Sequence, residues 1–240
     1  MFERPHHQRI ARVLETLDGG RLRELSCWFG GGTAIALRYG EYRESVDVDL
    51  LVSDLVGYRQ LRQLLAGRDL SSISRPGHAP LALARETRAD QYGIRTMLLV
   101  DGVQVKFEIV FEARIVLDAP GRNETLCGVP ALTRTDMAAS KLLANSDRWR
   151  DDSVFSRDAI DLAMMNLPPR WLQPAMDKAR GAYGPGIVVD MRQAIAALRE
   201  RQGWLPRCMQ SLAITLPPAA IHQRLRALQR RLAAVAAPPL

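Results

Sequence analysis

The sequence predicts an α/β domain over residues 1–130, followed by an all-α domain over residues 131–240. Two patterns support this division. The first half alternates apolar strand-like runs with amphipathic helical patterns, and it contains the hairpin turn signal Asp101-Gly102. After Val129-Pro130, apolar residues recur only at helical spacing. With 240 residues, the chain is long enough to bury a sizeable core in two small domains or in one large domain.

The elements of the first half follow from hydrophobic periodicity. Residues 6–25 have helical spacing with a break at Gly19-Gly20, and His6 and His7 at the start are expected to be exposed. The run Val46–Val52 alternates as a strand, and its apolar face is expected to hold Val46, Val48 and Leu50. The remaining predicted elements are a helix over 34–39, a helix over 55–67 capped by Ser53-Asp54, a loop over 68–80, strands over 81–86, 92–101 and 103–111, and a connector over 112–131.

The second half is predicted to consist of helices alone. The last helix has apolar residues at spacings of four and three, as in a helix that docks one face on a core: Ile221, Leu225, Leu228, Leu232 and Val235. Its arginines leave open a role in facing RNA or an antitoxin. The predicted helices cover residues 136–149, 156–166, 171–183, 187–202, 204–213 and 218–235.

The most informative stretch carries two acids on one strand. Asp47 and Asp49 are two positions apart, so a strand directs both side chains to the same face. Neighbouring carboxylates repel each other and are costly to bury, which a divalent cation would offset. Hard oxygen ligands suit Mg²⁺, which also binds substrate phosphates. A solvated strand edge is the plain alternative for this motif taken alone.

A glycine run precedes these acids. Gly31, Gly32 and Thr33 open a short helical pattern, and the first backbone N–H groups of a helix are free to bind a phosphate. Glycine permits close approach of a ligand, and the threonine hydroxyl adds a donor. By itself this run would indicate only a tight turn. Together with the two acids, it predicts a phosphate site beside a metal pair.

The order of these motifs resembles the DNA polymerase β-like nucleotidyltransferase superfamily. Within it, GGTAIALRYG followed by R-x-S-x-D-V-D-L resembles the AbiEii/AbiGii toxin family of type IV toxin–antitoxin and abortive-infection systems. The resemblance spans about residues 28–165. It implies an α/β (α+β) nucleotidyltransferase domain with a mixed sheet, followed by an all-α helical domain that completes the active site.

The resemblance also assigns roles in the first half. A third carboxylate is expected on a neighbouring strand, and Glu108 in VKFEIV matches that position. Asp47, Asp49 and Glu108 would then be catalytic residues that hold two Mg²⁺ ions. Taken alone, Glu108 is an ordinary outward residue of an amphipathic strand. Glu112 is the alternative ligand if a bulge shifts the register.

A second motif supplies the remaining candidates. Family members carry a lysine on one helix and Arg-Asp-x-x-Asp-Leu on the next, which here are Lys141 and the run that begins at Arg157. The resemblance implies that Lys141 contacts the triphosphate and that Asp158 orients it. Asp161 would share this nucleotide-binding role or contribute to helix packing. The link over 145–156 is longer than expected, and it carries two arginines that could bind phosphate or be solvated.

Charge is distributed unevenly. Residues 1–120 hold 16 basic and 16 acidic side chains, whereas residues 121–240 hold 17 and 10 and account for the whole net charge of +7. A basic second half favours a polyanionic partner, although a soluble basic surface would look the same. The three cysteines are too few and too widely spaced for a disulfide framework, which is consistent with a cytoplasmic protein.

The implied activity is transfer of a nucleoside monophosphate from an NTP to an acceptor, with loss of pyrophosphate. By resemblance the acceptor is RNA, as in family members that modify the tRNA 3′ end, and a cognate antitoxin is expected. A protein or small-molecule hydroxyl, or a catalytically inactive nucleotide- or RNA-binding module, are the alternatives. No apolar run approaches the length of a membrane span, so no membrane partner is expected.

Overall fold

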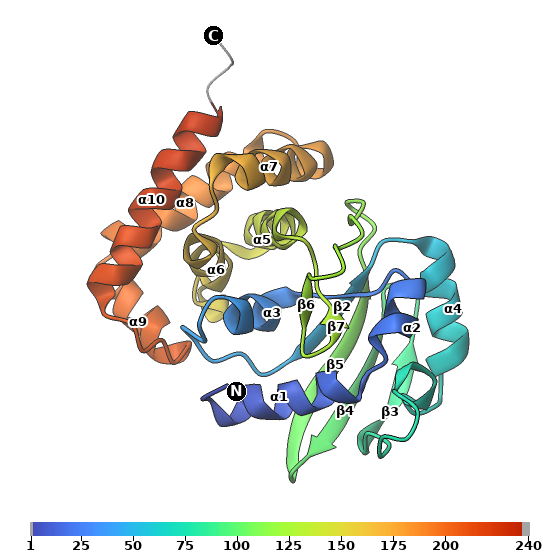
Figure 1. The fold of residues 1–240 in the computed structure, drawn as a ribbon. Helices are drawn as coiled ribbons and strands as arrows, with labels where there is room; N and C mark the ends of the chain where they lie inside the picture. Colours follow the sequence, from blue (N-terminus) through green and yellow to red (C-terminus); the bar gives the residue numbers. More distant parts are fainter. Residues whose placement is uncertain (1, 237–240) are drawn as a thin grey trace. The chain divides into compact units, whose positions relative to one another are not determined.

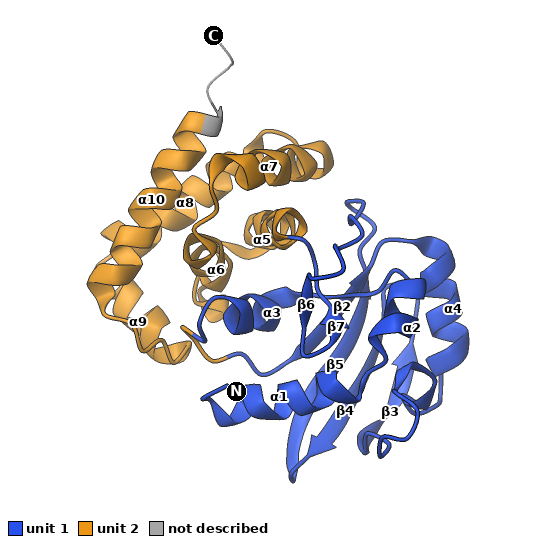
Figure 2. Cartoon of the chain, in the orientation of Figure 1, with its two compact units in different colours: residues 1–41, 45–133 blue, residues 42–44, 134–240 orange. Residues whose placement is uncertain are grey.

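The structure is a computed structural model that describes residues 2–236. Its contacts divide the chain into two compact units, which Figure 2 shows in different colours. Unit 1 comprises residues 1–41 and 45–133, and unit 2 comprises residues 42–44 and 134–240. The short segment 42–44 therefore belongs to unit 2, although the chain on either side of it belongs to unit 1.

Unit 1 is built on a five-stranded sheet in the order β1-β2-β5-β4-β3 (Figure 1). Only β2 and β5 run parallel to each other, and the other three pairings are antiparallel. The sheet is therefore mixed, which confirms the predicted fold class. The strands are β1 (Trp28–Phe29), β2 (Val48–Val52), β3 (Leu83–Ala89), β4 (Gly93–Val100) and β5 (Val103–Phe111).

Two helices of unit 1, α1 and α2, precede the first strand in sequence, and α3 and α4 lie between strands. Asp18 begins α2, because its carboxylate accepts hydrogen bonds from the first free N–H groups of that helix. Asp54 caps α4 in the same way, as predicted. The elements are α1 (Pro5–Thr16), α2 (Gly19–Glu24), α3 (Gly31–Arg38), α4 (Leu55–Leu65), a 3₁₀ turn (Ser71–Ile73) and the small hairpin of β6 (Thr125–Leu126) and β7 (Val129–Pro130).

The two faces of the sheet differ in burial. On β5, Val105, Phe107 and Ile109 are buried, whereas Gln104 and Lys106 are exposed and Glu108 is half-buried. Tyr58 of α4 stacks on Phe111 with ring centroids 4.9 Å apart, which places α4 on the buried face. We call the opposite side, which carries Lys106 and Glu108, the open face of the sheet.

Three details of unit 1 differ from the sequence prediction. The strand begins at Val48, and Val46 is 41% exposed instead of lying in the core. The helical pattern over 6–25 breaks at Leu17–Asp18, one step before the two glycines, because Asp18 caps the second helix. His7 is completely buried, not exposed, since both of its ring nitrogens have polar partners.

Unit 2 is helical, as predicted. The apolar side of α10 is buried at Ile221, Leu225, Leu228 and Leu232, and this helix contacts α6, α7 and α8. No helix in the described part of the chain has both the length and the apolar character that crossing a bilayer requires. The elements are α5 (Arg134–Arg148), a 3₁₀ turn (Asp152–Val154), α6 (Arg157–Met165), α7 (Pro169–Tyr183), α8 (Gly186–Glu200), α9 (Trp204–Ser211) and α10 (Pro218–Ala236).

A substitution at Gly19 tests how tightly α2 packs on the β6–β7 hairpin. A Cβ atom added there would lie 2.2 Å from the carbonyl oxygen of Gly128, so the backbone would have to move. We expect Gly19→Ala to lower the free energy of unfolding by about 1–3 kcal/mol, as in other overpacked cores. Gly181→Ala in α7 is the control, because the added atom meets nothing within 4 Å and alanine favours helix. Chemical denaturation that gives both variants equal stability would contradict this packing.

Candidate functional site

Two of the predicted carboxylates are neighbours across the parallel strand pair. Asp49 of β2 is in register with Glu108 of β5, so both side chains leave the same, open face of the sheet. Asp47 lies two residues before Asp49, just ahead of the first residue of β2. The pairing of β2 with β5 therefore brings together acids that are 59 residues apart in sequence.

Glu108 is held by two cations. Arg95 Nε donates to Oε1 at 2.5 Å, and Lys106 Nζ donates to Oε2 at 2.6 Å. Burial by itself would raise the pKa of Glu108, but the hydrogen bonds from Lys106 and Arg95 outweigh it and lower the pKa below its usual value. Glu108 is therefore ionised at neutral pH, with both oxygens engaged.

Lys106 binds Glu108 and also lies within the electrostatic influence of Asp49 and Asp47. Partial burial lowers the pKa of Lys106, but the hydrogen bond to Glu108 and the charges of Glu108, Asp49 and Asp47 raise it above the usual value. The described residues contain no group of three or more Asp, Glu, His or Cys side chains already arranged to hold a metal. Carboxylate oxygens are suitable ligands for a hard divalent cation. To bind such a cation, however, Glu108 would have to give up its hydrogen bond with Lys106. The roles of the three acids as metal ligands stay predictions.

The glycine run lies directly against Asp49. Gly31 begins α3 with a φ of +67°, and a Cβ atom added there would lie 2.3 Å from Asp49 Oδ2. The backbone N–H of Gly30 donates to the carbonyl oxygen of Asp49 at 2.8 Å. Glycine is thus required at position 31 both by the backbone conformation and by the carboxylate beside it. The N-terminal turn of α3, including Gly32, is consequently placed next to an acid of the site.

Thr33 is tied to the connector between α3 and β2. Its buried hydroxyl donates to Ser45 Oγ at 2.8 Å, and the Ser45 N–H donates to His7 Nε2 at 3.2 Å. The other nitrogen of His7, Nδ1, lies 2.7 Å from Glu41 Oε1 and carries the proton, since Nε2 is an acceptor. This chain of hydrogen bonds fixes the connector at both ends. The Thr33 hydroxyl therefore has a partner within the protein, and its predicted contact with phosphate is untested.

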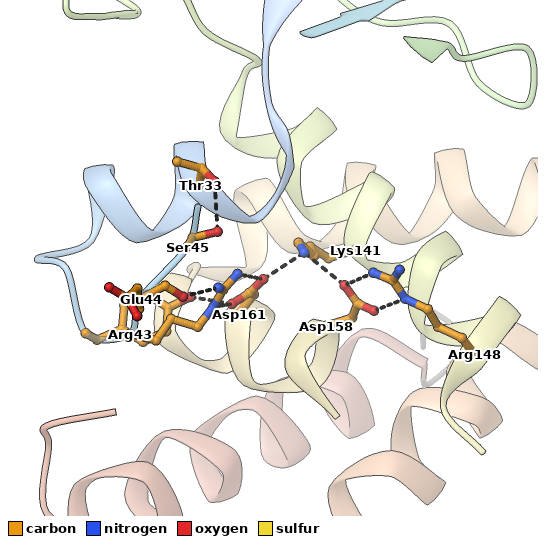
Figure 3. A network of polar contacts seen from close by, with 9 residues as sticks. Thr33, Arg43, Glu44, Ser45, Lys141, Arg148, Asp158 and Asp161 are labelled. Atoms are coloured by element: carbon orange, nitrogen blue, oxygen red, sulfur yellow. Dashed lines mark hydrogen bonds and ion pairs between the residues drawn. The ribbon is translucent and has the colours of Figure 1, made fainter. Parts of the chain in front are cut away.

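Lys141 lies at the centre of a buried ionic network in unit 2 (Figure 3). Its ammonium group is 2.9 Å from Asp158 Oδ1 and 2.7 Å from Asp161 Oδ2, one acid on each side. Both aspartates are on α6, one helical turn apart, and Lys141 is on α5. The structure therefore brings together the lysine and both acids of the second motif.

Asp158 connects Lys141 to the surface through Arg148. The Arg148 guanidinium donates to Oδ2 at 2.7 Å and to Oδ1 at 3.0 Å, and its side chain is 32% exposed. Burial alone would raise the pKa of Asp158, but the charge of Lys141 and the hydrogen bond from Arg148 lower it well below its usual range. Asp158 is thus a fixed anion that holds the two cations in place.

Asp161 is fully buried and more completely enclosed. Arg43 donates to it from Nε at 2.6 Å and from Nη2 at 2.9 Å, and the Tyr42 hydroxyl donates at 2.5 Å. Desolvation would raise the pKa of Asp161, whereas the charges of Arg43 and Lys141 lower it. Because both oxygens are engaged and no surface is exposed, this geometry favours positioning of Lys141 over direct contact with a nucleotide.

The network includes residues to which the sequence analysis gave no role. Arg43 is the arginine of the R-x-S-x-D-V-D-L motif, and its position in that motif was the available signal. Tyr42 gave no such signal. With Arg43, Lys141 and Arg148 set against two aspartates, the network has a formal charge of +1, and Arg148 is its exposed end. Such an arrangement can attract an anion.

Neutralising Asp158 should destabilise unit 2 in a pH-dependent way. The pKa of Asp158 is depressed in the folded state, so its contribution to stability is present above the unfolded pKa of about 3.9 and is lost as pH falls. We expect Asp158→Asn to lower the unfolding free energy by about 3–5 kcal/mol at neutral pH, since it breaks a buried pair. The difference from wild type should shrink below about pH 4.

Denaturant titrations at several pH values measure this effect. Asp177→Asn is the matched control, because that carboxylate is 58% exposed and pairs with Arg180 only at 3.6 Å. Such surface pairs contribute at most about 1 kcal/mol. A pH-independent loss in Asp158→Asn would contradict the assigned ionisation.

Replacing Gly31 should damage the site beyond its effect on stability. Alanine at position 31 or at Gly40, which has a φ of +85°, incurs a cost of about 1–2 kcal/mol for the left-handed backbone. Only at position 31 does the new Cβ meet Asp49, because nothing lies within 4 Å of it at position 40. Because this contact adds strain at position 31 alone, we expect a lower melting temperature in Gly31→Ala than in Gly40→Ala, and weaker Mn²⁺ binding only in Gly31→Ala. Equal Mn²⁺ affinities, measured by electron paramagnetic resonance, would contradict this view.

Comparison with known proteins agrees with the order of motifs. Residues 19–228 match the model of the family described as nucleotidyl transferase AbiEii toxin, type IV TA system. None of the curated protein sequences compared with the chain matches it significantly.

Two solved structures are similar over most of their length. The protein JHP933 from Helicobacter pylori is 19% identical, with a TM-score of 0.44 over 96% of this chain and 97% of its own. A candidate nucleotidyltransferase from H. pylori is 17% identical, with a TM-score of 0.36 over 92% and 96% of the two chains.

The family match covers nearly the whole chain, including the glycine run, Asp47, Asp49, Glu108, Lys141 and the two acids of α6. The chain belongs to the AbiEii family of nucleotidyltransferase toxins of type IV toxin–antitoxin systems.

Proposed function

We propose that the protein transfers a nucleoside monophosphate from an NTP to RNA in a Mg²⁺-dependent reaction, with the 3′ end of tRNA as the expected acceptor. The acceptor hydroxyl oxygen forms a bond to the α-phosphorus, and the bond from that phosphorus to the bridging oxygen breaks. Pyrophosphate leaves, and the hydroxyl proton passes to solvent. The toxin would act in the cytoplasm, where both substrates occur, and a cognate antitoxin would counter it.

The observation that carries this proposal is the alignment of Asp49 with Glu108 beside Gly31. The acids occupy one level of the open face, and the first turn of α3 lies in contact with one of them. Free N–H groups at a helix N-terminus bind phosphate oxygens, and carboxylates bind the cation that accompanies a triphosphate. An NTP needs both kinds of group, and unit 1 offers them side by side.

Asp47, Asp49 and Glu108 are the residues that would hold Mg²⁺, with two ions expected. When bound, the metal would neutralise phosphate charge and lower the pKa of the acceptor hydroxyl. The protein's own contribution is to hold Glu108 ionised and in register with Asp49 before a substrate binds. Lys106 and Arg95 provide this by balancing the charge of Glu108, which would otherwise repel Asp49.

Unit 2 contributes positive charge that suits an anionic nucleotide. Lys141 acts as a point charge toward phosphate, while Asp158 and Asp161 fix its position. Arg148, the exposed end of the network, can add a second cation. Nucleotidyl transfer requires little covalent chemistry from the protein, so that positioning and charge neutralisation account for most of the rate.

Transfer of label to RNA tests the proposal directly. Wild-type protein is incubated with Mg²⁺, each α-³²P-labelled NTP in turn, and either total RNA or tRNA. We expect label in RNA with at least one NTP, and a loss of at least about 10³-fold in Asp49→Ala, as for other groups that stabilise transition-state charge. Glu15→Ala on the exposed side of α1 is the control and should retain activity.

The destination of the label separates the alternatives. Label recovered in protein or in a small molecule, with none in RNA, would exclude RNA as the acceptor. Binding of NTP without transfer to any acceptor, in wild type and Asp49→Ala alike, would instead indicate an inactive nucleotide-binding module. Omission of Mg²⁺ should abolish the transfer, and retention of full activity in the presence of a chelator would contradict the metal requirement.

A further inference from the structure

The open face of the sheet carries a row of charged side chains that crosses four strands. Arg88 of β3 is paired with Arg95 of β4, Arg95 with Glu108 of β5, and Glu108 with Asp49 of β2. Paired residues on adjacent strands direct their side chains to the same face. We call this set the charged row. It is acidic at its β2 end and basic at its β3 end.

A second level of the same face carries two cations. Arg85 of β3 is paired with Met97 of β4, and Met97 with Lys106 of β5. Lys106 neighbours the acids at the β2 end, while Arg85 adds a cation at the β3 end. Strands are about 4.8 Å apart, so Arg88 lies roughly 14 Å from Asp49 along the row. A strip of basic side chains therefore extends along the sheet to the predicted metal site. This strip is longer than the surface that one phosphate group of an NTP would contact.

The outer arginines are available to a ligand. Arg85 and Arg88 are exposed, and no ion pair is recorded for either within the described residues. Arg95, by contrast, is held between Asp90 and Glu108. Glu86, the nearest acid on β3, lies toward the end of α4, since a Cβ atom on Gly67 would approach its Oε1 to 3.8 Å.

Two adjacent arginines are an unfavourable cross-strand pair without a counter-ion. Like charges directly opposite each other in a sheet reduce stability, and of the two arginines only Arg95 has acidic partners, Asp90 and Glu108, among the described residues. Guanidinium groups bind phosphate with paired, charge-assisted hydrogen bonds. Tyr92, in the β3–β4 turn next to this end of the row, is 65% exposed and offers a flat surface for base stacking.

We infer that the β3–β4 part of the open face binds the sugar-phosphate backbone of the RNA acceptor and directs its 3′ end toward Asp49 and Glu108. This inference rests on the proposed function and specifies the acceptor surface of the same site. It assigns RNA contact to unit 1, although the excess of basic residues lies in the second half of the chain. Arg85 and Arg88 supply phosphate contacts, and Tyr92 supplies a stacking contact.

The test measures RNA binding separately from catalysis. A single-stranded RNA with a 5′-fluorescein label and a free 3′ hydroxyl is titrated with full-length protein without NTP, at salt concentrations of about 50–200 mM. We expect Arg85→Gln/Arg88→Gln to bind at least tenfold more weakly. Two lost phosphate contacts should also reduce the slope of log K against log salt by roughly 1.4, at about 0.7 for each contact.

Two further variants separate specific from general effects. Arg59→Gln/Arg62→Gln on α4 removes the same charge from exposed positions on the covered side of the sheet, and it should leave affinity and slope unchanged. Tyr92→Ala should weaken binding severalfold with an unchanged slope, because stacking releases no counter-ions. Equal losses in the two double-arginine variants would overturn the inference, as would preferential binding of poly-glutamate over RNA.

Nucleotide transfer by the same proteins distinguishes the two proposals. If wild type labels RNA and Arg85→Gln/Arg88→Gln matches it in affinity, salt slope and apparent KM for RNA, the acceptor surface is wrong and the proposed function stands. If wild type labels no RNA, but RNA affinity still depends on Arg85 and Arg88, the surface stands and the transfer reaction is wrong. A raised KM for RNA with unchanged KM for NTP is the expected result.

Discussion

The ion pair between Arg43 and Asp161 is the interaction on which the arrangement of the second motif depends. Asp161 is fully buried, and a buried carboxylate without partners would be neutralised or would destabilise the fold. Tyr42 and Arg43 Nε bind one oxygen of this carboxylate, and Arg43 Nη2 and Lys141 share the other. The lysine is thereby fixed between two aspartates instead of extending into solvent.

This ion pair also explains why the segment 42–44 belongs to the helical unit. The connector between α3 and β2 contributes Arg43 to α6 of unit 2, while its flanking residues Glu41 and Ser45 are held in unit 1 by His7. One short stretch of sequence therefore supplies the glycine run, an anchor for the lysine network and the strand of acids. The R-x-S-x-D-V-D-L motif itself contains the anchor Arg43 and the acids Asp47 and Asp49.

On the open face of the sheet, as in the lysine network, charged side chains are balanced by oppositely charged neighbours. Asp49 and Glu108 are adjacent because β2 and β5 pair in parallel, and Arg95 and Lys106 offset the repulsion that results. Gly31 allows the backbone of α3 to lie against the same carboxylate. Glu108 is consequently ionised, and Asp49 leaves the same face of the sheet beside it.

Periodicity and motif spacing determined much of this protein from the sequence alone. Periodicity predicted the α/β half and the helical half, because alternation and helical repeats are local properties of the chain. The family and the residues expected to meet came from the resemblance that the motifs carry. The strand ends and the break near Asp18 were placed less well, since a capping side chain shifts a boundary by one or two residues.

Only the tertiary structure decided which distant residues became neighbours. The contact between Arg43 and Asp161 spans 118 positions, and the register of Asp49 with Glu108 depends on which strand β2 selects as its partner. The burial of His7 and the pairing of Arg88 with Arg95 arise in the same way. Hydrophobic patterns specify that a segment is a strand or a helix, but the partner of each charge is set by the packing of whole elements.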